Sequence, residues 1–131
     1  MIDLDRFKSV NDTHGHQTGD AALRALAQFM VRGVRSTDVV CRFGGEEFVV
    51  VLSDTTAAGA TALAEKLCAQ LKEVQMRGGE EWALPVSFTI TCGVAGFPED
   101  GSEADALVRA ADTRLYRGKD EGRDRVVGPP D

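Results

Sequence analysis

Two pairs of acidic side chains occur where the sequence predicts strand ends, and together they form a candidate metal site. Glu46 and Glu47 follow two glycines and lead into an apolar run, while Asp3 and Asp5 end the short apolar segment that opens the chain. If these strands are neighbours, Asp3 lies beside Glu46 or Glu47, and converging carboxylates are costly unless a cation lies between them. Oxygen ligands favour Mg²⁺ or Mn²⁺. The structural alternatives are a solvated hairpin tip and an ordinary strand end.

Two glycines and three backbone amides near these acids are candidates for phosphate binding. Gly44 and Gly45 have no side chains that block a phosphate, and they permit the positive φ angles of a tight hairpin. The backbone N–H groups of Arg6, Phe7 and Lys8 follow the first strand, where they could form a nest for anionic oxygens. Because Mg²⁺ commonly binds together with substrate phosphates, the pattern favours a phosphate-containing ligand.

Two basic residues late in the chain form a second candidate phosphate grip. Lys119 and Arg123 lie four positions apart near the end of the third predicted helix, so we expect them to share a helical face. The structural alternative is a cationic helix terminus that complements the helix dipole.

Polar side chains in the segment after the first strand are suited to a nucleobase. Asn11 and Asp20 can pair with the donors and acceptors on the edge of guanine. Their structural alternatives are loop capping for Asn11 and the N-cap of the first helix for Asp20. His14 and His16 have no further ligands nearby in the sequence, so we expect both to be structural.

Length and composition indicate one globular domain over 1–131. The chain is 43% hydrophobic, carries a formal net charge of -6, and holds no apolar run near the roughly 20 residues of a membrane span. Such a charge disfavours nucleic acid as a partner, so an anionic ligand needs a local basic site or a metal. Three widely spaced cysteines fit reduced core residues. We expect no membrane contact by this segment and a cytoplasmic location.

Hydrophobic periodicity predicts an α+β domain with a mainly antiparallel sheet flanked by helices. The expected elements are a strand at 1–4, a loop at 5–20, a helix at 20–34, strands at 39–43 and 48–52, a helix at 60–74, a turn opening a hairpin at 76–82, a strand at 87–96, a helix at 102–122 with a capping-box-like start at Ser102 and Asp105, a strand at 124–127 and a disordered tail at 128–131. Alternation in the strand at 87–96 places Phe88, Ile90, Cys92 and Val94 on one face.

Four segments, in this order and spacing, closely resemble the GGDEF-type diguanylate cyclase domain in its GGEEF variant. They are DLDRFKSVNDTHGHQTGD, RFGGEEF, SFTITCGVA and ADTRLYRGKDEGRDRV, and the similarity extends from about Asp3 to Val127. The resemblance implies a fold like the palm of nucleotide polymerases and nucleotide cyclases. It also implies a reaction in which two GTP molecules yield cyclic di-GMP and two pyrophosphates.

The resemblance assigns catalytic and metal-binding roles to matching positions. Asp3 and Glu46 would bind Mg²⁺ (or Mn²⁺) together with the main-chain carbonyl of Leu4, and Glu47 would stand beside them as a second catalytic acid. Glu46 is the expected proton acceptor for the attacking 3′-hydroxyl.

The substrate-binding roles that the resemblance implies fall on eight positions. They are guanine recognition by Asn11 and Asp20, phosphate contacts by Phe7 and Lys8, close approach of the triphosphate at Gly44 and Gly45, and a grip on the terminal phosphates by Lys119 and Arg123. Each domain would hold one GTP, so turnover would need a homodimer with two sites face to face. A sensor or receiver domain is expected to precede this segment in a longer protein, which could be anchored to a membrane.

Arg35 and Asp38 form an RxxD motif, and five residues separate Asp38 from Gly44. In the family this placement resembles an inhibitory site for the product, because arginine binds the Hoogsteen edge of guanine and aspartate accepts from its N1 and N2 donors. Lys66 on the second long helix would assist. The structural alternative is a local salt bridge at a strand start.

The chain departs from the family at its front. Members usually carry a helix and an LTxLxNR-like motif before the first strand, whereas this chain begins almost at Asp3. We therefore expect an N-terminally truncated domain that lacks this helix and exposes an apolar patch. The alternatives to an active cyclase are a catalytically silent module that binds GTP or cyclic di-GMP, and a dimerisation element of a larger signalling protein.

Overall fold

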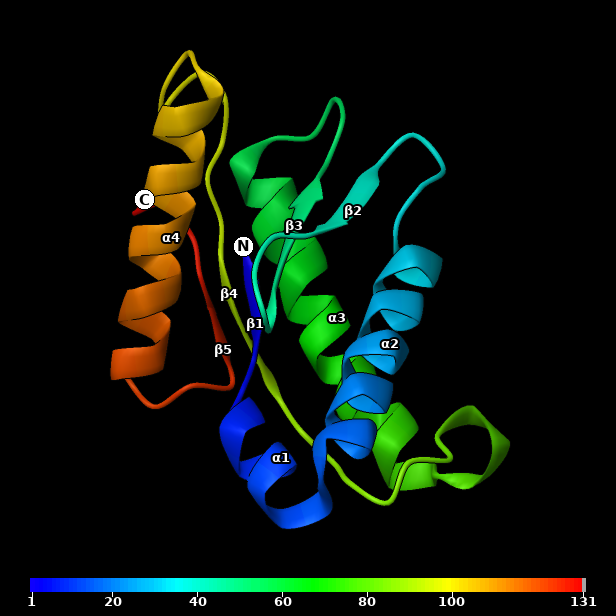
Figure 1. Ribbon diagram of the computed structural model, residues 1–131. Coiled ribbons are helices and arrows are strands. Elements are labelled where there is room, and N and C mark those ends of the chain that lie inside the picture. The colour runs from blue at the N-terminus through cyan, green and yellow to red at the C-terminus, as the bar shows by residue number, and fades with distance from the viewer. Residues whose placement is uncertain (131) are drawn as a thin grey trace.

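A five-stranded mixed sheet with helices on both faces forms the domain (Figure 1). The computed structural model describes residues 1–130. In chain order its elements are β1 (Ile2–Leu4), α1 (Phe7–His14), α2 (His16–Gly33), β2 (Val39–Arg42), β3 (Glu47–Val51), α3 (Ala57–Arg77), the 3₁₀ turn η1 (Gly79–Glu81), β4 (Ile90–Gly93), α4 (Ala104–Asp120) and β5 (Arg125–Val127). The strand order is β2-β3-β1-β4-β5, and only the pair β4–β5 is parallel, which confirms the expected fold class.

Strand alternation divides the core between the two faces of the sheet. Ile2 and Leu4 of β1 point with Phe48 of β3 toward α2 and α3, whose buried side chains complete the larger cluster. On the opposite face, Ala111 and Leu115 of α4 pack with Met1. Figure 1 shows α4 on one side of the sheet and α2 with α3 on the other. Asp3 lies between Ile2 and Leu4 in sequence, so its carboxylate belongs to the face that α4 covers.

Most of the segment 5–20 is helical, so the expectation of a loop there was wrong. Phe7 and Val10 of α1 pack inward. The helix ends at His14, and Gly15, with a φ of 89°, separates it from α2. An eight-residue helix with two inward side chains gives too little periodicity to detect. Asp20 consequently lies within α2 and is not its N-cap.

Other local expectations also fail at element ends. The segment after η1 approaches β4 without forming a hairpin strand, and the N-cap of α4 is Glu103, with no side-chain cap from Ser102. Cys41 is exposed rather than in the core. Of the expected tail, Asp131 lies outside the described residues. The expected face of Phe88, Ile90, Cys92 and Val94 is confirmed, because all four are buried in the larger cluster.

An apolar cavity of about 380 Å³ lies beside Met1, at the start of β1. It is lined by Val50 of β3, by Ala95 in the segment after β4, and by residues of α3 and α4. Near it, Val39 and Val51 are 50% and 54% exposed on the β2–β3 hairpin. Both valines are exposed apolar side chains, and the apolar patch expected from an absent helix stays a prediction.

A partly buried ion pair holds the segment after β4 against α4. The Arg114 guanidinium donates to both carboxylate oxygens of Asp100 at 2.8 Å and to the carbonyl of Val94, while Asp100 also accepts from the Gly96 N–H. The hydrogen bonds from Arg114 and Gly96 lower the pKa of Asp100 to about 2. Because the folded-state pKa lies below the unfolded value, the ion pair stabilises the fold above about pH 4, and this contribution is lost as pH falls toward 2.

We expect Asp100→Asn to lower the free energy of unfolding by about 1–2 kcal/mol at pH 7, because a bidentate, mostly buried contact is lost. Urea titrations at several pH values measure this. The difference from the unsubstituted chain should shrink as pH falls below 4. Glu121→Gln breaks the exposed pair with Arg117 and should change stability by less than about 0.5 kcal/mol. A pH-independent difference for Asp100→Asn would contradict the assignment.

Candidate active site

Strand pairing brings the two acidic segments together. β1 runs antiparallel to β3 with Asp3 opposite Glu47, and the Leu4 N–H donates to the Glu46 carbonyl at 3.2 Å. Neighbouring side chains on one face of an antiparallel pair lie within contact distance. The structure therefore places Asp3, Glu46 and Glu47 at one end of the β1–β3 pair, as the sequence predicted for neighbouring strands.

Asp3 is a nearly buried carboxylate paired with a lysine from the far end of the chain. Its side chain is 3% exposed, and the Lys119 ammonium donates to its Oδ2 at 2.5 Å. Burial, with a smaller contribution from Glu46, raises the pKa of Asp3 to about 6 in spite of Lys119. Burial lowers the pKa of Lys119, but Asp3, Glu47 and Glu46 together raise it above its usual value. The site therefore carries more negative charge than one lysine balances.

The donor set fits a hard divalent cation bound jointly with a ligand. Within residues 1–130 no group of three or more His, Cys, Asp or Glu side chains is arranged to hold a metal by itself. The available oxygens are the carboxylates of Asp3 and Glu46 and the backbone carbonyl of Leu4, which suit Mg²⁺ with phosphate oxygens completing the shell. The ammonium of Lys119 already stands at Asp3 as a positive charge.

Asp5, the second acid of the opening pair, has a structural role that the sequence did not reveal. It is buried and accepts hydrogen bonds from the hydroxyls of Thr89 and Thr91 at 2.7 and 2.5 Å and from the Asp124 N–H at 3.0 Å. These contacts join β1, β4 and the turn before β5. Thr89 and Thr91 alternate with the apolar residues of this strand, and this alternation was the sequence signal for polar partners of Asp5.

Asn11 has a buried acceptor without a hydrogen-bond donor. Its Oδ1 is a buried side-chain polar atom with no hydrogen-bond partner among the described residues, and such an atom is costly unless a ligand satisfies it. Gly19 of α2 lies against it, since a Cβ there would stand 1.8 Å from Oδ1 and 3.3 Å from the Phe7 ring. Asp20 is exposed at the next position. Gly19 was not among the residues that the sequence singled out.

The turn between β2 and β3 is wider than predicted. Neither Gly44 nor Gly45 has a positive φ, and both Phe43 and Gly44 donate to the Glu47 carbonyl, at 2.8 and 3.3 Å. The expected tight turn with positive φ angles was therefore wrong, because the loop spans more residues than such a turn allows. The Arg42 side chain donates to the carbonyls of Gly44 and Gly45, a contact that sequence reasoning missed.

The other residues predicted to bind phosphate lie in different surroundings. Lys8 is exposed near Asp12, and the Phe7 ring packs against the core. Lys119 lies in the last turn of α4, but the helix ends at Asp120 and Arg123 follows with φ 65°. Arg123 and Lys119 therefore do not share a helical face, because the chain turns away before position 123.

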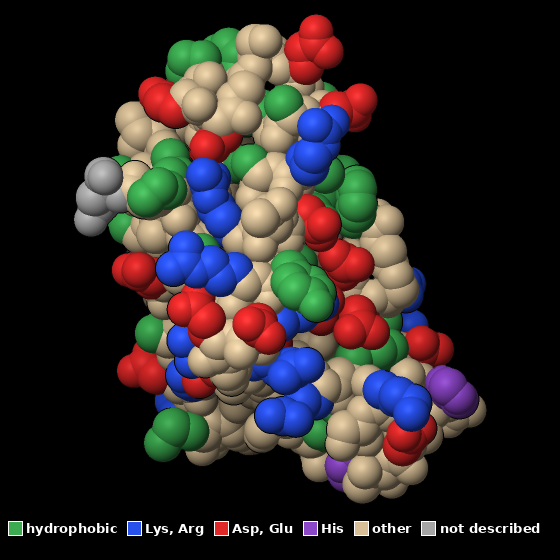
Figure 2. Space-filling model, turned by 90° about the vertical axis from the view of Figure 1, so that its left-hand side faces the viewer, with side chains coloured by type: hydrophobic (Ala, Val, Ile, Leu, Met, Phe, Trp, Pro, Cys, Tyr) green, Lys and Arg blue, Asp and Glu red, His purple; other side chains and the backbone are tan. Residues whose placement is uncertain are grey.

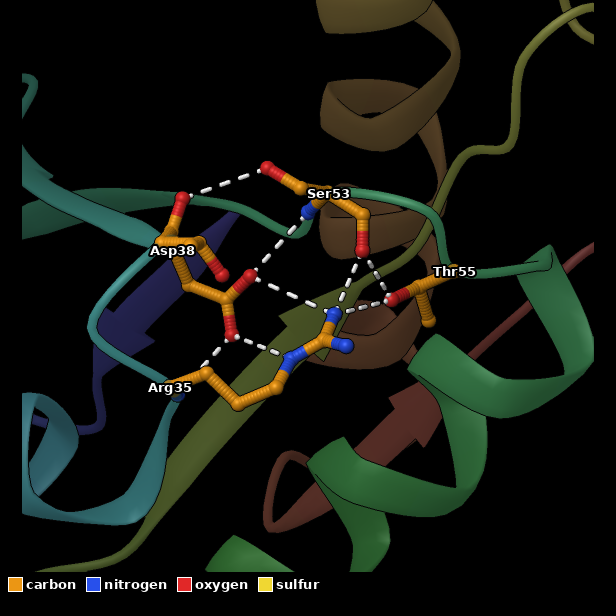
Figure 3. Close-up of polar contacts among 5 residues, drawn as sticks. Arg35, Asp38, Ser53 and Thr55 are labelled. Carbon is orange, nitrogen blue, oxygen red and sulfur yellow. Dashed lines mark hydrogen bonds and ion pairs between the residues drawn. The ribbon is translucent and has the colours of Figure 1, made fainter.

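Arg35 and Asp38 form a hydrogen-bonded network with the end of β3 (Figure 3). Arg35 donates to Asp38, to the Ser53 carbonyl and to the Thr55 hydroxyl, while Asp38 accepts from the backbone N–H groups of Arg35 and Ser53. Although burial opposes it, this set of donors lowers the pKa of Asp38. A cavity of about 360 Å³ lies beside the network. Lys66 is exposed on α3 outside the residues that line the cavity.

Charge on the face covered by α4 is mixed. Figure 2 shows acidic and basic side chains interspersed on this face. None of the helices within residues 1–130 combines the length and apolar character that a membrane crossing requires.

Comparison with known proteins gives a single consistent family. The family model described as "Diguanylate cyclase, GGDEF domain" matches residues 1–125. "Diguanylate cyclase A" of Treponema denticola is 39% identical over 128 residues, which cover 97% of this chain and 33% of that protein. The chain thus spans about a third of that relative's length.

Solved structures agree in fold. The active GGEEF domain of a diguanylate cyclase from Vibrio cholerae superimposes with a TM-score of 0.83 and 30% identity over 96% of this chain and 78% of that one. The GGDEF domain of DgcB from Caulobacter crescentus in complex with c-di-GMP gives a TM-score of 0.81 and 31% identity over 96% of this chain and 73% of that one.

We expect Gly19→Ala to lower the free energy of unfolding by about 1–3 kcal/mol, because the new methyl group collides with the Asn11 side chain. In an uncrowded helix the same change would stabilise by roughly 1 kcal/mol. Urea denaturation measures the difference. Gly59→Ala is the control in α3, where a Cβ meets only threonine side-chain atoms at 3.3 Å. A stabilised Gly19→Ala would mean that Asn11 moves aside freely.

Proposed function

Because the chain belongs to the GGDEF diguanylate cyclase family, we propose that it condenses two GTP molecules into cyclic di-GMP with release of two pyrophosphates. The observation that carries this proposal is the nearly buried carboxylate of Asp3, with Glu46 close by and Lys119 in contact. One buried carboxylate, two partly buried acids beside it and a single lysine in contact suit a divalent cation and a triphosphate better than a structural ion pair.

Asp3, Glu46 and the Leu4 carbonyl would hold Mg²⁺ (or Mn²⁺). When bound, the ion neutralises charge on the phosphates and lowers the pKa of the attacking 3′-hydroxyl. Glu46 accepts the proton of that hydroxyl, with Glu47 beside it as the second acid. The hydrogen bond from the Leu4 N–H to the Glu46 carbonyl holds the start of β3 against β1, so these acids stay in place while phosphates bind.

Asn11 and Asp20 would read the guanine base. The Asn11 Oδ1 has no donor within residues 1–130, so it is free to accept a hydrogen bond from the N–H groups of guanine. Asp20, exposed on α2 next to Gly19, would accept a second one.

The triphosphate would extend from the base toward the β2–β3 turn. Gly44 and Gly45 leave the backbone open there, and the Arg42 contacts to their carbonyls hold the turn in shape. Phe7 and Lys8 would contribute at the start of α1. Lys119, in the last turn of α4, and Arg123, in the turn after it, would contact the terminal phosphates.

Turnover would require a homodimer. One domain offers one guanine site and one set of acids, and each GTP must present its 3′-hydroxyl to the α-phosphate of the other. The chain spans about a third of its relative's length, so regulatory domains outside this segment, a sensor or a receiver, would control the encounter. GTP as substrate favours a cytoplasmic location for this domain.

Arg35 and Asp38 would form an inhibitory product site, with Lys66 nearby. Support comes from the donor and acceptor set, the adjoining cavity and the related GGDEF domain of DgcB, described as a complex with c-di-GMP. Arg35 is already engaged by Asp38, Ser53 and Thr55, so the product must replace those contacts.

We expect Glu46→Gln to reduce cyclic di-GMP formation from GTP and Mg²⁺ at least a hundredfold, because a carboxylate ligand and proton acceptor is lost. Chromatography of the reaction products measures it, and Glu73→Gln on the exposed face of α3 serves as the matched control. Undiminished activity in Glu46→Gln would refute the catalytic assignment. Binding of cyclic di-GMP or GTP without any turnover by the unsubstituted chain would instead indicate a sensor module.

We expect Arg35→Ala to relieve inhibition by cyclic di-GMP, raising its inhibition constant at least tenfold, since a bidentate guanine contact disappears. Initial rates at increasing product concentration measure it. Thr55→Val removes one neighbour of Arg35 but leaves the guanidinium, so inhibition should persist. Equal inhibition of Arg35→Ala and the unsubstituted chain would remove the regulatory role.

A further inference from the structure

The contact between Lys119 and Asp3 joins a metal-binding acid to a phosphate-binding base. The two residues are 116 positions apart, and the ammonium lies 2.5 Å from Oδ2 of Asp3. The carboxylate is 3% exposed, whereas the lysine side chain is 31% exposed and reaches the solvent side of the site. The pair therefore lies at the place where the proposed function needs both a metal and a nucleotide.

Close packing of α4 on β4 produces this contact. A Cβ at Gly118 would stand 2.7 Å from the Thr91 side chain, so glycine allows the last turn of α4 to approach the sheet beside Asp3. A lysine in the last turn of a helix is also favoured by the helix dipole.

Lys119 is the cation that faces the acids in this state. Its ammonium contacts the Asp3 carboxylate, and Asp3 lies opposite Glu47 in the β1–β3 pair. The next residue, Leu4, donates its N–H to the Glu46 carbonyl. The neighbouring basic residues of α4 and its surroundings are engaged elsewhere: Arg117 pairs with Glu121, Arg114 with Asp100, and Lys72 with Asp124. The charge of the acidic cluster thus depends on this one flexible side chain.

We propose that Lys119 is an exchangeable counter-ion: without nucleotide its ammonium neutralises the metal-binding acids, and nucleotide phosphates draw it away as the divalent cation arrives. This inference rests on the proposed function for the identity of the ligands. An ammonium in contact with Asp3 repels a cation at the same carboxylate, so the metal alone binds weakly. Phosphate oxygens offer the lysine another anion, and its four-carbon stem lets it move there.

Cooperative binding follows from this exchange. Nucleotide removes the competing positive charge from Asp3, which raises the affinity for the metal, and linkage requires that the metal raises nucleotide affinity by the same factor. The acids are consequently never left without a positive charge, whichever ligand is present. Metal and GTP would enter as a pair rather than one after the other.

The test measures Mn²⁺ binding to the whole chain by electron paramagnetic resonance, without and with a GTP analogue that has a methylene group between its α- and β-phosphates. For Lys119→Met we expect nucleotide-free Mn²⁺ affinity to rise at least fivefold. We expect the gain in Mn²⁺ affinity on adding the analogue to be at least fivefold smaller than in the unsubstituted chain, because only direct ligation by the phosphates remains. Lys119→Gln provides a second neutral variant should Met destabilise the fold. Asp3→Asn should abolish the binding, which locates the ion.

Two matched variants separate the specific contact from general electrostatics. Lys119→Arg keeps a cation at Asp3, and Arg117→Met removes one positive charge from the same helix end without touching Asp3. Both should keep nucleotide-free Mn²⁺ affinity within about twofold of the unsubstituted chain. Unchanged or weaker Mn²⁺ binding in both neutral Lys119 variants overturns the inference. Failure of the proposed function is distinguishable, because it appears as absent cyclic di-GMP while the Mn²⁺ affinities still shift.

Discussion

The burial of one carboxylate in the middle of a three-residue strand governs the arrangement of this domain. β1 is anchored by Ile2 and Leu4 in the larger core, and Asp3 is thereby directed to the opposite face. A buried negative charge requires a compensating partner, so α4 must bring Lys119 to it, and the β2–β3 turn must carry its own acids near enough to share that cation. Three separate parts of the chain meet because of this charge.

The strands could be predicted largely from alternation, and the failures have local physical causes. Phe88, Ile90, Cys92 and Val94 gave a period of two that only a half-buried strand explains, and their burial confirms it. The short helix α1 offers little more than Phe7 and Val10 as apolar positions, which is too few for a helical pattern to stand out from a polar loop. The parallel pairing of β5 depends on the chain path after α4, and no local pattern encodes it.

At the site, residue types and resemblance predicted which residues take part, but they could not predict the contacts between them. Glu46 and Asp3 were expected as neighbours because adjacent strands were expected, and the sheet places them so. The Lys119–Asp3 contact spans nearly the whole chain and depends on how closely α4 packs, which sequence spacing cannot express. Sequence spacing did not reveal Gly19 either, because its role is to leave space for the Asn11 side chain.

The apolar hollow beside β1 has a mechanical consequence for the acid in the middle of that strand. Met1 exchanges hydrogen bonds with Gly93, and both residues line the hollow together with Ile2. Ile2 is also the neighbour of Asp3 in β1. Side chains packed into the hollow would therefore stiffen the strand that carries the Asp3 carboxylate, without touching a ligand.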